Sequence, residues 1–174
     1  MFSIESCKIP DNALLSNHQG EGSCTDCYVT SIQGSVSQTR FVTAFYTTPV
    51  FKLERLILKV AASRPSTDIQ AEQLATGASD VFAAWDVEAR THNQLLMSDF
   101  SRRTRCWLMA VPATGSSHQY TRLYFGSAVV PVNNPKTGKL APGWMFRALL
   151  GFHKLYSVVL LYAAKSRLQA QQRA

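Results

Sequence analysis

The sequence has none of the short motifs that mark common nucleotide-binding or hydrolytic sites. It contains no GxGxxG, no phosphate-binding P-loop, no GxSxG and no HExxH, each of which places particular side chains or backbone amides around a substrate. No serine, histidine and aspartate are placed to suggest a catalytic triad. These absences disfavour nucleotide-dependent chemistry, and we predict no resident metal and no cofactor.

Charged residues are also few, at 17% of the 174 residues, while hydrophobic residues make up 46%. This balance is typical of a single folded domain with a large core. The formal net charge of +7 favours anionic partners, but the basic residues form only two modest clusters, Arg102-Arg103-Arg105 and Lys165-Arg167-Arg173. Because no RNA-binding strand motif or zinc-finger spacing accompanies them, we expect no binding to nucleic acid.

A basic N-terminal region followed by an apolar run, which would indicate a secretion signal, is missing as well. We therefore expect a cytoplasmic protein. The most apolar segment, residues 146–164, contains Arg147, His153 and Lys154. A membrane-spanning helix requires about 20 residues with few or no charges, so this segment predicts a buried helix and no transmembrane segment. A basic helix lying on a membrane surface is the alternative.

The four cysteines form no evident metal site or disulfide framework. Cys24 and Cys27 are spaced as CxxC, which could supply half of a zinc site or a redox pair. A zinc site needs a full set of ligands, and the only nearby candidates, Cys7 and His18, lack a paired spacing of their own. A redox motif of the thioredoxin type follows a strand and begins a helix, whereas this pair precedes a predicted strand. We interpret Cys24 and Cys27 as incidental cysteines and do not expect disulfides.

The distribution of apolar and turn-forming residues predicts an alternation of strands and helices. In chain order we predict a strand at 27–32, two helices between residues 35 and 62 that meet at Pro49, a short helix at 68–77, strands at 82–90, 94–98, 105–111 and 120–130, and a helix at 144–168. Gly126 in the last strand predicts a bulge or a bend. We predict an irregular segment at 1–25, a single α+β domain at 26–168 and a frayed tail at 169–174.

This order of elements predicts an α+β fold in which a curved antiparallel sheet of about five or more strands wraps around a long C-terminal helix. The helix needs such cover because residues 144–168, WMFRALLGFHKLYSVVLLYAAKSRL, are apolar around most of its circumference.

The order resembles the helix-grip arrangement of the START and Bet v 1-like (SRPBCC) superfamily, whose members enclose an apolar cavity between sheet and helix. The likeness covers residues 26–168, with fewer predicted strands and a longer first helix than is usual there. The segments TTPVFKLERLIL, RLYFGSAV and FHKLYSVVLLYAAK also resemble a group of uncharacterised bacterial proteins, which implies nothing about a reaction.

Two groups of polar residues are candidates for acid–base chemistry. Asp86 and Glu88 share one face of a predicted strand, where a buried carboxylate would act as an acid or base. We interpret that face, which Arg90 continues, as solvated, and we place Trp85, Val87 and Ala89 on the core side. His153, Tyr156 and Ser157 would point together from the C-terminal helix, although a lone histidine on an apolar helix is more often structural.

A further candidate is the alternating face formed by Tyr120, Arg122 and Tyr124, with Arg105 and Trp107 on the preceding strand. An arginine inside an apolar cavity would anchor a carboxylate or phosphate group. On an outer face the same residues would form cross-strand pairs. The outer face is favoured, because Leu123, Phe125 and Val129 make the opposite face the more apolar one.

Taken together, the resemblance and the supply of aromatic residues predict a protein that binds a hydrophobic or amphipathic small molecule between the sheet and the C-terminal helix. The residues predicted to contact it are Tyr46, Trp85, Arg105, Trp107, Arg122, Tyr124, Phe152, His153 and Tyr156. One alternative is an enzyme of the cyclase, hydrolase or isomerase type on the same scaffold, using His153, Tyr156 or Asp86. The other is a membrane-surface or protein-interaction module that uses the basic C-terminal helix.

Overall fold

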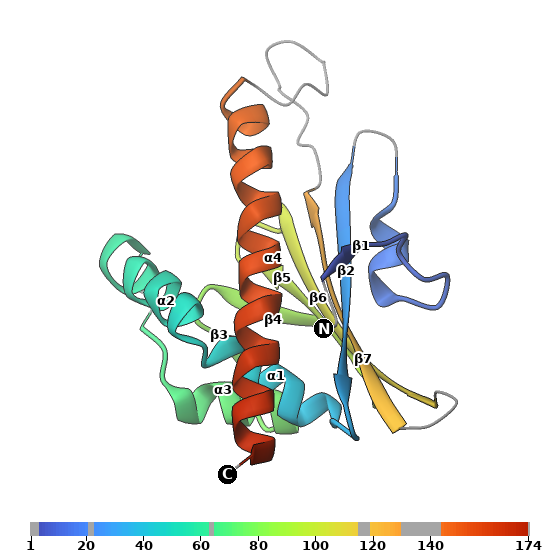
Figure 1. The fold of residues 1–174 in the computed structure, drawn as a ribbon. Helices are drawn as coiled ribbons and strands as arrows, with labels where there is room; N and C mark the ends of the chain where they lie inside the picture. The colour runs from blue at the N-terminus through green and yellow to red at the C-terminus, as the bar shows by residue number, and fades with distance from the viewer. Residues whose placement is uncertain (1–3, 21–22, 63–64, 115–118, 130–143, 174) are drawn as a thin grey trace.

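A computed structural model describes residues 4–20, 23–62, 65–114, 119–129 and 144–173, with the side chains of the last helix described from Leu155 onward. The elements in chain order are β1 (Glu5–Ser6), the 3-10 helix η1 (Leu14–His18), β2 (Cys24–Gln33), α1 (Gln38–Tyr46), α2 (Pro49–Ala62), α3 (Asp68–Thr76), β3 (Val81–Phe82), β4 (Trp85–Arg90), β5 (Gln94–Asp99), β6 (Thr104–Thr114), β7 (Gln119–Val129) and α4 (Trp144–Arg173). Figure 1 shows α4 crossing one face of the sheet, while the N-terminal residues lie beyond β2 on the other side.

The described strands form one antiparallel sheet of seven strands in the order β1-β2-β7-β6-β5-β4-β3. Strands β3 to β7 follow one another as a meander, and β2 pairs with β7, so the first long strand lies beside the last one. The predicted α+β fold, with its long C-terminal helix packed on a curved antiparallel sheet, is confirmed. The two-residue strand β1 was not among the predicted strands, because two residues carry no readable periodicity, and the end of β3 was merged with β4 in one predicted strand.

The predicted break between the first two helices lies where Pro49 places it. Pro49 is the first residue of α2, a position where its fixed φ is suitable and its missing N–H costs nothing. The hydroxyl of Thr48 donates to the carbonyl of Phe45 at 3.0 Å and accepts from the amide of Phe51 at 3.1 Å. This one side chain therefore closes α1 and caps α2. Local chemistry also determines both ends of α3. Thr67 and Gln70 form a capping box at its start, and Gly77 ends the helix in the left-handed conformation, with a φ of 84°.

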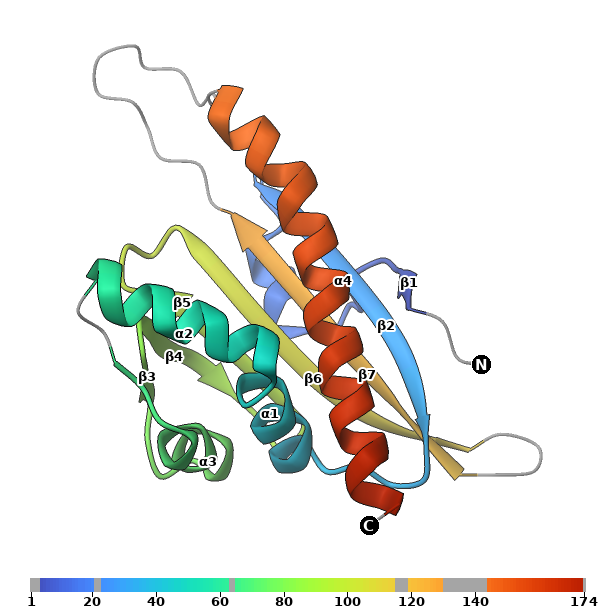
Figure 2. The ribbon, with the colours of Figure 1, turned by 60° about the vertical axis from the view of Figure 1, so that its left-hand side comes forward.

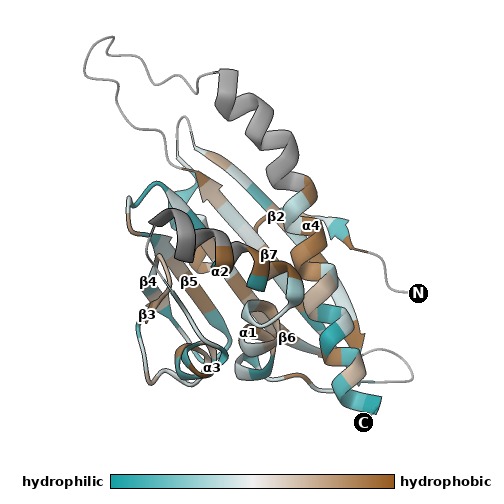
Figure 3. Cartoon of the chain, turned by 90° about the vertical axis from the view of Figure 1, so that its left-hand side faces the viewer, coloured by the Kyte–Doolittle hydropathy of each residue, from teal (hydrophilic) through white to brown (hydrophobic). Residues whose placement is uncertain are grey.

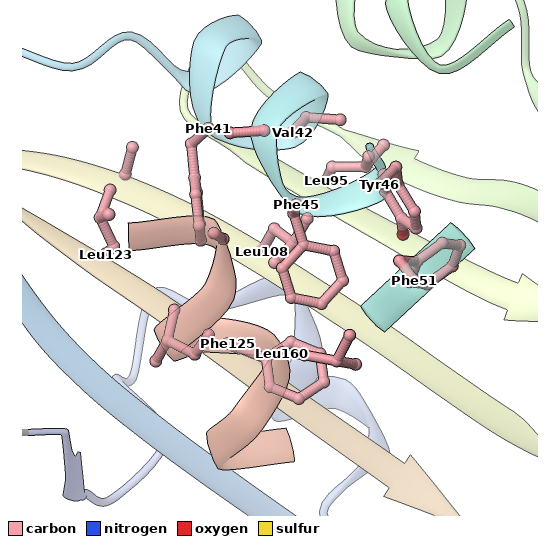
Figure 4. Packing of buried hydrophobic residues seen from close by; sticks show 14 of the residues in the cluster. Phe41, Val42, Phe45, Tyr46, Phe51, Leu95, Leu108, Leu123, Phe125 and Leu160 are labelled. Atoms are coloured by element: carbon pink, nitrogen blue, oxygen red, sulfur yellow. The ribbon is translucent and has the colours of Figure 1, made fainter. Parts of the chain in front are cut away.

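Helices α1, α2 and α4 cover one face of the sheet, which we call the front face (Figure 2). An aromatic group from α1, α2 and β7 lies in the core beneath them (Figure 4). The ring centroids of Tyr46 and Phe51 are 4.8 Å apart, and those of Phe45 and Phe125 are 5.1 Å apart. Such pairs add to the hydrophobic stabilisation of the core. Leu160 of α4 belongs to the same core.

The opposite, back face of the sheet is covered by the N-terminal segment, here residues 7–18. This segment was predicted irregular, yet it is fixed by the side chain of Gln94, which is 5% exposed. The Gln94 amide oxygen accepts from the Leu14 amide at 2.9 Å, and its nitrogen donates to the Asn12 carbonyl at 3.0 Å. The same oxygen accepts from the Trp107 indole at 2.9 Å.

Leu15 is fully buried on the back face, directly over Gly126 of β7. A Cβ at Gly126 would lie 2.7 Å from Leu15 Cδ2 and 3.0 Å from Trp107 Cε3. The strand pairs without a register shift at this residue. The predicted bulge is therefore wrong, and the missing side chain instead makes room for Leu15.

Three other predictions about single elements need correction. The predicted strand 82–90 is a tight hairpin of β3 and β4, turned at Ala83, whose φ is 55°. The pairing of β4 with β5 shifts by one residue between Val87 and Ala89, and such a shift reverses the side-chain alternation. Ala89 therefore packs on the back face, against the cluster that contains Leu15 and Trp107. Arg90 points to the other face, where it donates to the carbonyl of Leu74 at 2.5 Å. The predicted frayed tail is helical to Arg173, and Gln172 donates to the carbonyl of Gln33 at 3.0 Å.

Hydropathy follows this arrangement (Figure 3). Hydrophobic colours run along the strands beneath the helices and through the middle of α4, and hydrophilic colours prevail over its last turns. Within the described residues, no helix has the length and apolar character needed to cross a lipid bilayer.

Replacing Gly126 with alanine should lower the free energy of unfolding by about 1–3 kcal/mol, because the new methyl group overlaps buried Leu15 and Trp107. Urea denaturation measures the loss. Gly20→Ala is the matched control, since nothing lies within 4 Å of a Cβ at Gly20, and it should change stability by less than about 0.5 kcal/mol. In a Leu15→Ala background the Gly126→Ala loss should shrink. An undiminished loss there would contradict the contact.

Candidate functional site

A cavity of about 520 Å³ lies between the front face of the sheet and helices α2 and α4. Its walls are mainly apolar and come from α1, α2, the β3–β4 turn, strands β4, β6 and β7, the β5–β6 turn and α4. The apolar wall residues include Phe45, Val50, Phe51, Ala84, Phe125 and Leu160. Figure 4 shows that Phe45, Phe125 and Leu160 lie close together there. A space of this size and character is typical of small-molecule pockets.

The cavity wall also contains several hydroxyl groups and one thiol. The Tyr46 hydroxyl lies 3.6 Å from the Cys106 sulfur, and both residues line the cavity. The Ser127 hydroxyl donates to Asp26 Oδ1 at 2.5 Å. Tyr156 and the fully buried Ser157 line the α4 side. Because each hydroxyl has one donor and two acceptor sites, this set can recognise a neutral polar group on a ligand.

The turn between β5 and β6 forms one edge of the cavity. Phe100 in this turn and Leu53 on α2 both line the cavity, yet they are 63% and 60% exposed. They therefore mark its boundary with solvent. The turn is held by Asp99, whose carboxylate accepts from the Ser101 hydroxyl and from the amides of Arg103 at 2.7 Å and Thr104 at 2.8 Å.

These hydrogen bonds control the ionisation of Asp99. Burial by itself raises the pKa of the carboxyl, but the bonds from Ser101, Thr104 and Arg103 outweigh burial and bring the pKa below its ordinary value. Asp99 is therefore ionised at neutral pH, and its oxygens accept the hydrogen bonds that hold the turn. This role makes it a structural residue of the cavity edge rather than an acid or base.

The structure brings together four of the predicted contact residues, Tyr46, Trp85, Arg105 and Tyr156, at the cavity. The Arg105 guanidinium, however, is bonded to Glu88 Oε2 at 3.0 Å and to the carbonyl of Arg102. Glu88 also lies 2.6 Å from His18 Nε2. Arg105 thus links β6 to β4, and Glu88 in turn contacts the N-terminal segment. The charge of Arg105 is already neutralised by a carboxylate.

Three other predicted contact residues lie away from the cavity. Trp107 and Tyr124 belong to the back-face cluster, with ring centroids 6.2 Å apart. Arg122 is exposed on the same face of β7 as Tyr124. The face of Leu123 and Phe125 is the one that meets the helices, as the sequence favoured, so these three residues form cross-strand and surface contacts.

The remaining candidates do not form a catalytic group in the described part of the molecule. The side chains of Phe152 and His153 lie outside the described residues. Asp86 is exposed on β4 and is not among the residues that line the cavity. No pair of Asp86 with Tyr156 is therefore formed at the cavity, and the enzyme alternative gains no support from these two residues.

Lys165 is turned inward, away from the basic surface predicted for the C-terminal helix. It is 6% exposed, and its ammonium donates to the Thr30 hydroxyl at 2.9 Å. Burial lowers its pKa. The outward face of α4 from Leu155 onward instead presents Leu155, Val159 and Tyr162 to solvent. This arrangement weakens the interpretation of α4 as a basic membrane-surface helix.

Sequence reasoning missed several cavity residues, among them Val50, Phe51, Phe100, Cys106 and Ser127. Phe51 is one of the apolar residues at helical spacing in α2, and such spacing is compatible equally with a solid core and with a cavity wall. Phe100 lies in a predicted turn, where a large exposed aromatic residue is the one signal that could have pointed to the cavity edge. Among the described residues, no group of three or more histidine, cysteine or acidic side chains is arranged to hold a metal ion.

Comparison with models of known protein families and with curated proteins finds no match to this sequence. The assignment of the site therefore depends on its geometry. An apolar cavity with a few hydroxyl groups indicates binding more directly than it indicates a reaction.

Replacing Asp99 with asparagine should lower the free energy of unfolding at pH 7 by about 1–2 kcal/mol, because the amide replaces a charged acceptor of three hydrogen bonds. The pKa of Asp99 is lower in the folded chain than in the unfolded one. The ionised carboxylate therefore stabilises the fold above about pH 4, and this stabilisation is lost as the pH falls through the folded pKa. The difference between Asp99→Asn and the parent protein should consequently shrink toward pH 3.

Urea denaturation at pH 7 and pH 3 measures both effects. Asp11→Asn is the control for a simple change of net charge, because Asp11 is exposed on the back-face segment. A loss for Asp99→Asn that is equal at the two pH values would show that the ionised carboxylate is not what holds the turn.

Proposed function

We propose that this protein binds an apolar or amphipathic small molecule in the cavity between the front face of the sheet and helices α2 and α4. The observation that carries the proposal is the cavity itself, about 520 Å³ in volume and lined mainly by aromatic and aliphatic side chains. Burial of an apolar ligand against such walls is favourable in proportion to the area removed from water. The order of strands and helices supports the same idea through its likeness to the helix-grip arrangement.

The polar groups of the wall favour a ligand with a neutral polar end. The hydroxyls of Tyr46, Tyr156 and Ser157 and the thiol of Cys106 line the wall, and hydroxyl groups of this kind suit a hydroxyl, carbonyl or ether oxygen on a ligand, since each has one donor and two acceptor sites. The Arg105 guanidinium is paired with Glu88 on the back face of the sheet. Arg105 therefore offers no positive charge to a ligand in the front-face cavity, which favours alcohols, ketones or esters over free acids.

Filling the cavity with a large side chain should weaken ligand binding. Val50 lines the cavity at the start of α2 and is half-buried, so Val50→Trp places an indole in the space with limited effect on the fold. Binding is measured with the neutral fluorescent probe N-phenyl-1-naphthylamine, whose emission rises in apolar surroundings. We expect Val50→Trp to weaken probe binding at least about tenfold, which corresponds to about 1.4 kcal/mol.

Leu56→Trp is the matched control, because it adds an indole to the same helix at a position that is 55% exposed and does not line the cavity. It should change the dissociation constant of the probe by less than about twofold, or roughly 0.4 kcal/mol. Thermal unfolding followed by circular dichroism verifies that both variants are folded. Equal losses in the two variants, or none in either, would place the probe elsewhere and overturn the proposal.

A further inference from the structure

Two cysteines that are distant in sequence lie in contact on the back face of the sheet. The sulfur atoms of Cys7 and Cys27 are 3.2 Å apart, and both are free thiols. Cys27 is 2% exposed, whereas Cys7 is half-buried. The CxxC spacing pointed to a different pair, but Cys24 and Cys27 lie on opposite faces of β2, because side chains alternate along a strand and these positions differ by an odd number.

The backbone holds the two thiols opposite each other. β1 pairs with β2 in the register Glu5↔Val29 and Ser6↔Tyr28, which continues to Cys7 opposite Cys27. The amide of Cys7 donates to the carbonyl of Cys27 at 2.9 Å. Directly opposed residues in such a pair have Cα atoms about 5.5 Å apart, within the range of about 4.4–6.8 Å that a disulfide spans.

The geometry points to Cys7 and Cys27 as a reversible dithiol–disulfide site that reacts with a low-molecular-weight disulfide of the glutathione type. The ionised sulfur of Cys7 attacks one sulfur of that disulfide and expels one small thiolate, which takes up a proton. A mixed disulfide then links Cys7 to the other half. The Cys27 sulfur, after losing its proton to water, attacks the Cys7 sulfur, and the second small thiolate leaves. In sum, two protein thiols are oxidised and one small disulfide is reduced to two thiols.

Exposure decides the order of these steps. Cys7 is the thiol that an external disulfide can reach, and the buried Cys27 lies in position to resolve the mixed disulfide. Burial raises the pKa of both thiols, and the bond to Cys27 offsets part of this effect at Cys7. Because the thiolate is the nucleophile, the reaction should become faster as the pH rises from 7 to 8.5.

The disulfide would fasten the N-terminal segment to the sheet. Cys7 begins this segment, which is also held by the Gln94 hydrogen bonds, by the packing of Leu15 over Gly126 and by the contact of His18 Nε2 with Glu88 Oε1. Closing the loop between residues 7 and 27 restricts the unfolded chain. Oxidation should raise the melting temperature by roughly 5–10 °C and slow amide exchange across residues 7–18.

The test uses the full chain, reduced and then incubated with oxidised glutathione at pH 8. Intact mass spectrometry should show a loss of about 2 Da and no lasting glutathione adduct, since the second step expels it. Trypsin cleaves after Lys8 and Arg40, so the disulfide joins the peptides 1–8 and 9–40. Because peptide 9–40 contains both Cys24 and Cys27, the mapping is repeated in Cys24→Ser, where only Cys27 remains as the partner.

The joined peptides should form in the parent protein, in Cys24→Ser and in Cys106→Ser, and dithiothreitol should reverse both the link and the rise in melting temperature. They should be absent in Cys7→Ser and in Cys27→Ser, and circular dichroism verifies that these two variants are folded. If Cys7→Ser is not folded, Cys7→Ala takes its place in the test. A link to Cys24 or Cys106, a stable glutathione adduct on Cys7 or failure of the folded parent protein to react would each overturn the inference.

Discussion

The central strands of this sheet are apolar on both faces, and the rest of the architecture follows from the need to cover both. In β5 every residue from Gln94 to Ser98 is buried. A strand with buried residues in succession cannot border solvent on either side. Helices α1, α2 and α4 satisfy this requirement on the front face, and the N-terminal segment satisfies it on the back face. Burying the polar side chain of Gln94 would be unfavourable without hydrogen-bond partners. Its amide group finds them in Asn12 and Leu14 of the N-terminal segment and in the Trp107 indole.

The two covers differ in how completely they fill the space beneath them. On the back face Leu15 meets Gly126 and Trp107 at packing distance, so that interface is dense. On the front face α1 and α4 pack over the aromatic core, but α2 leaves α1 at the Thr48–Pro49 break and runs toward the β5–β6 turn. The space between α2, α4 and the strands there is the cavity. A local feature of the sequence, one proline with one capping threonine, thus contributes to the position of the proposed binding site.

Local signals made the helices and most strands predictable, whereas the contacts that determine the site lie between distant residues. Pro49, Thr67 and Gly77 act within a few residues of themselves, and the break at Pro49 and a helix at 68–77 were predicted from the sequence. The side-chain face of Arg90 depends on a register shift, and the pairing of Arg105 with Glu88 depends on strand neighbours. Tyr46, Trp85 and Tyr156 were predicted at the cavity because they are aromatic residues of the elements that enclose it. Trp107 and Tyr124 met the same criterion but lie on the back face, which the alternation along β7 favoured because Leu123 and Phe125 make the opposite face the more apolar one.

The central claim is that the front-face cavity, and no other apolar surface, receives a small molecule. The most direct test is nuclear magnetic resonance of the protein with bound N-phenyl-1-naphthylamine, using intermolecular nuclear Overhauser effects to locate the probe. We predict contacts from the probe to Phe45, Phe51 and Leu160, which line the cavity. Contacts confined to Leu155, Val159 and Tyr162, the exposed apolar residues on the outer face of α4, would show that the cavity is not the binding site.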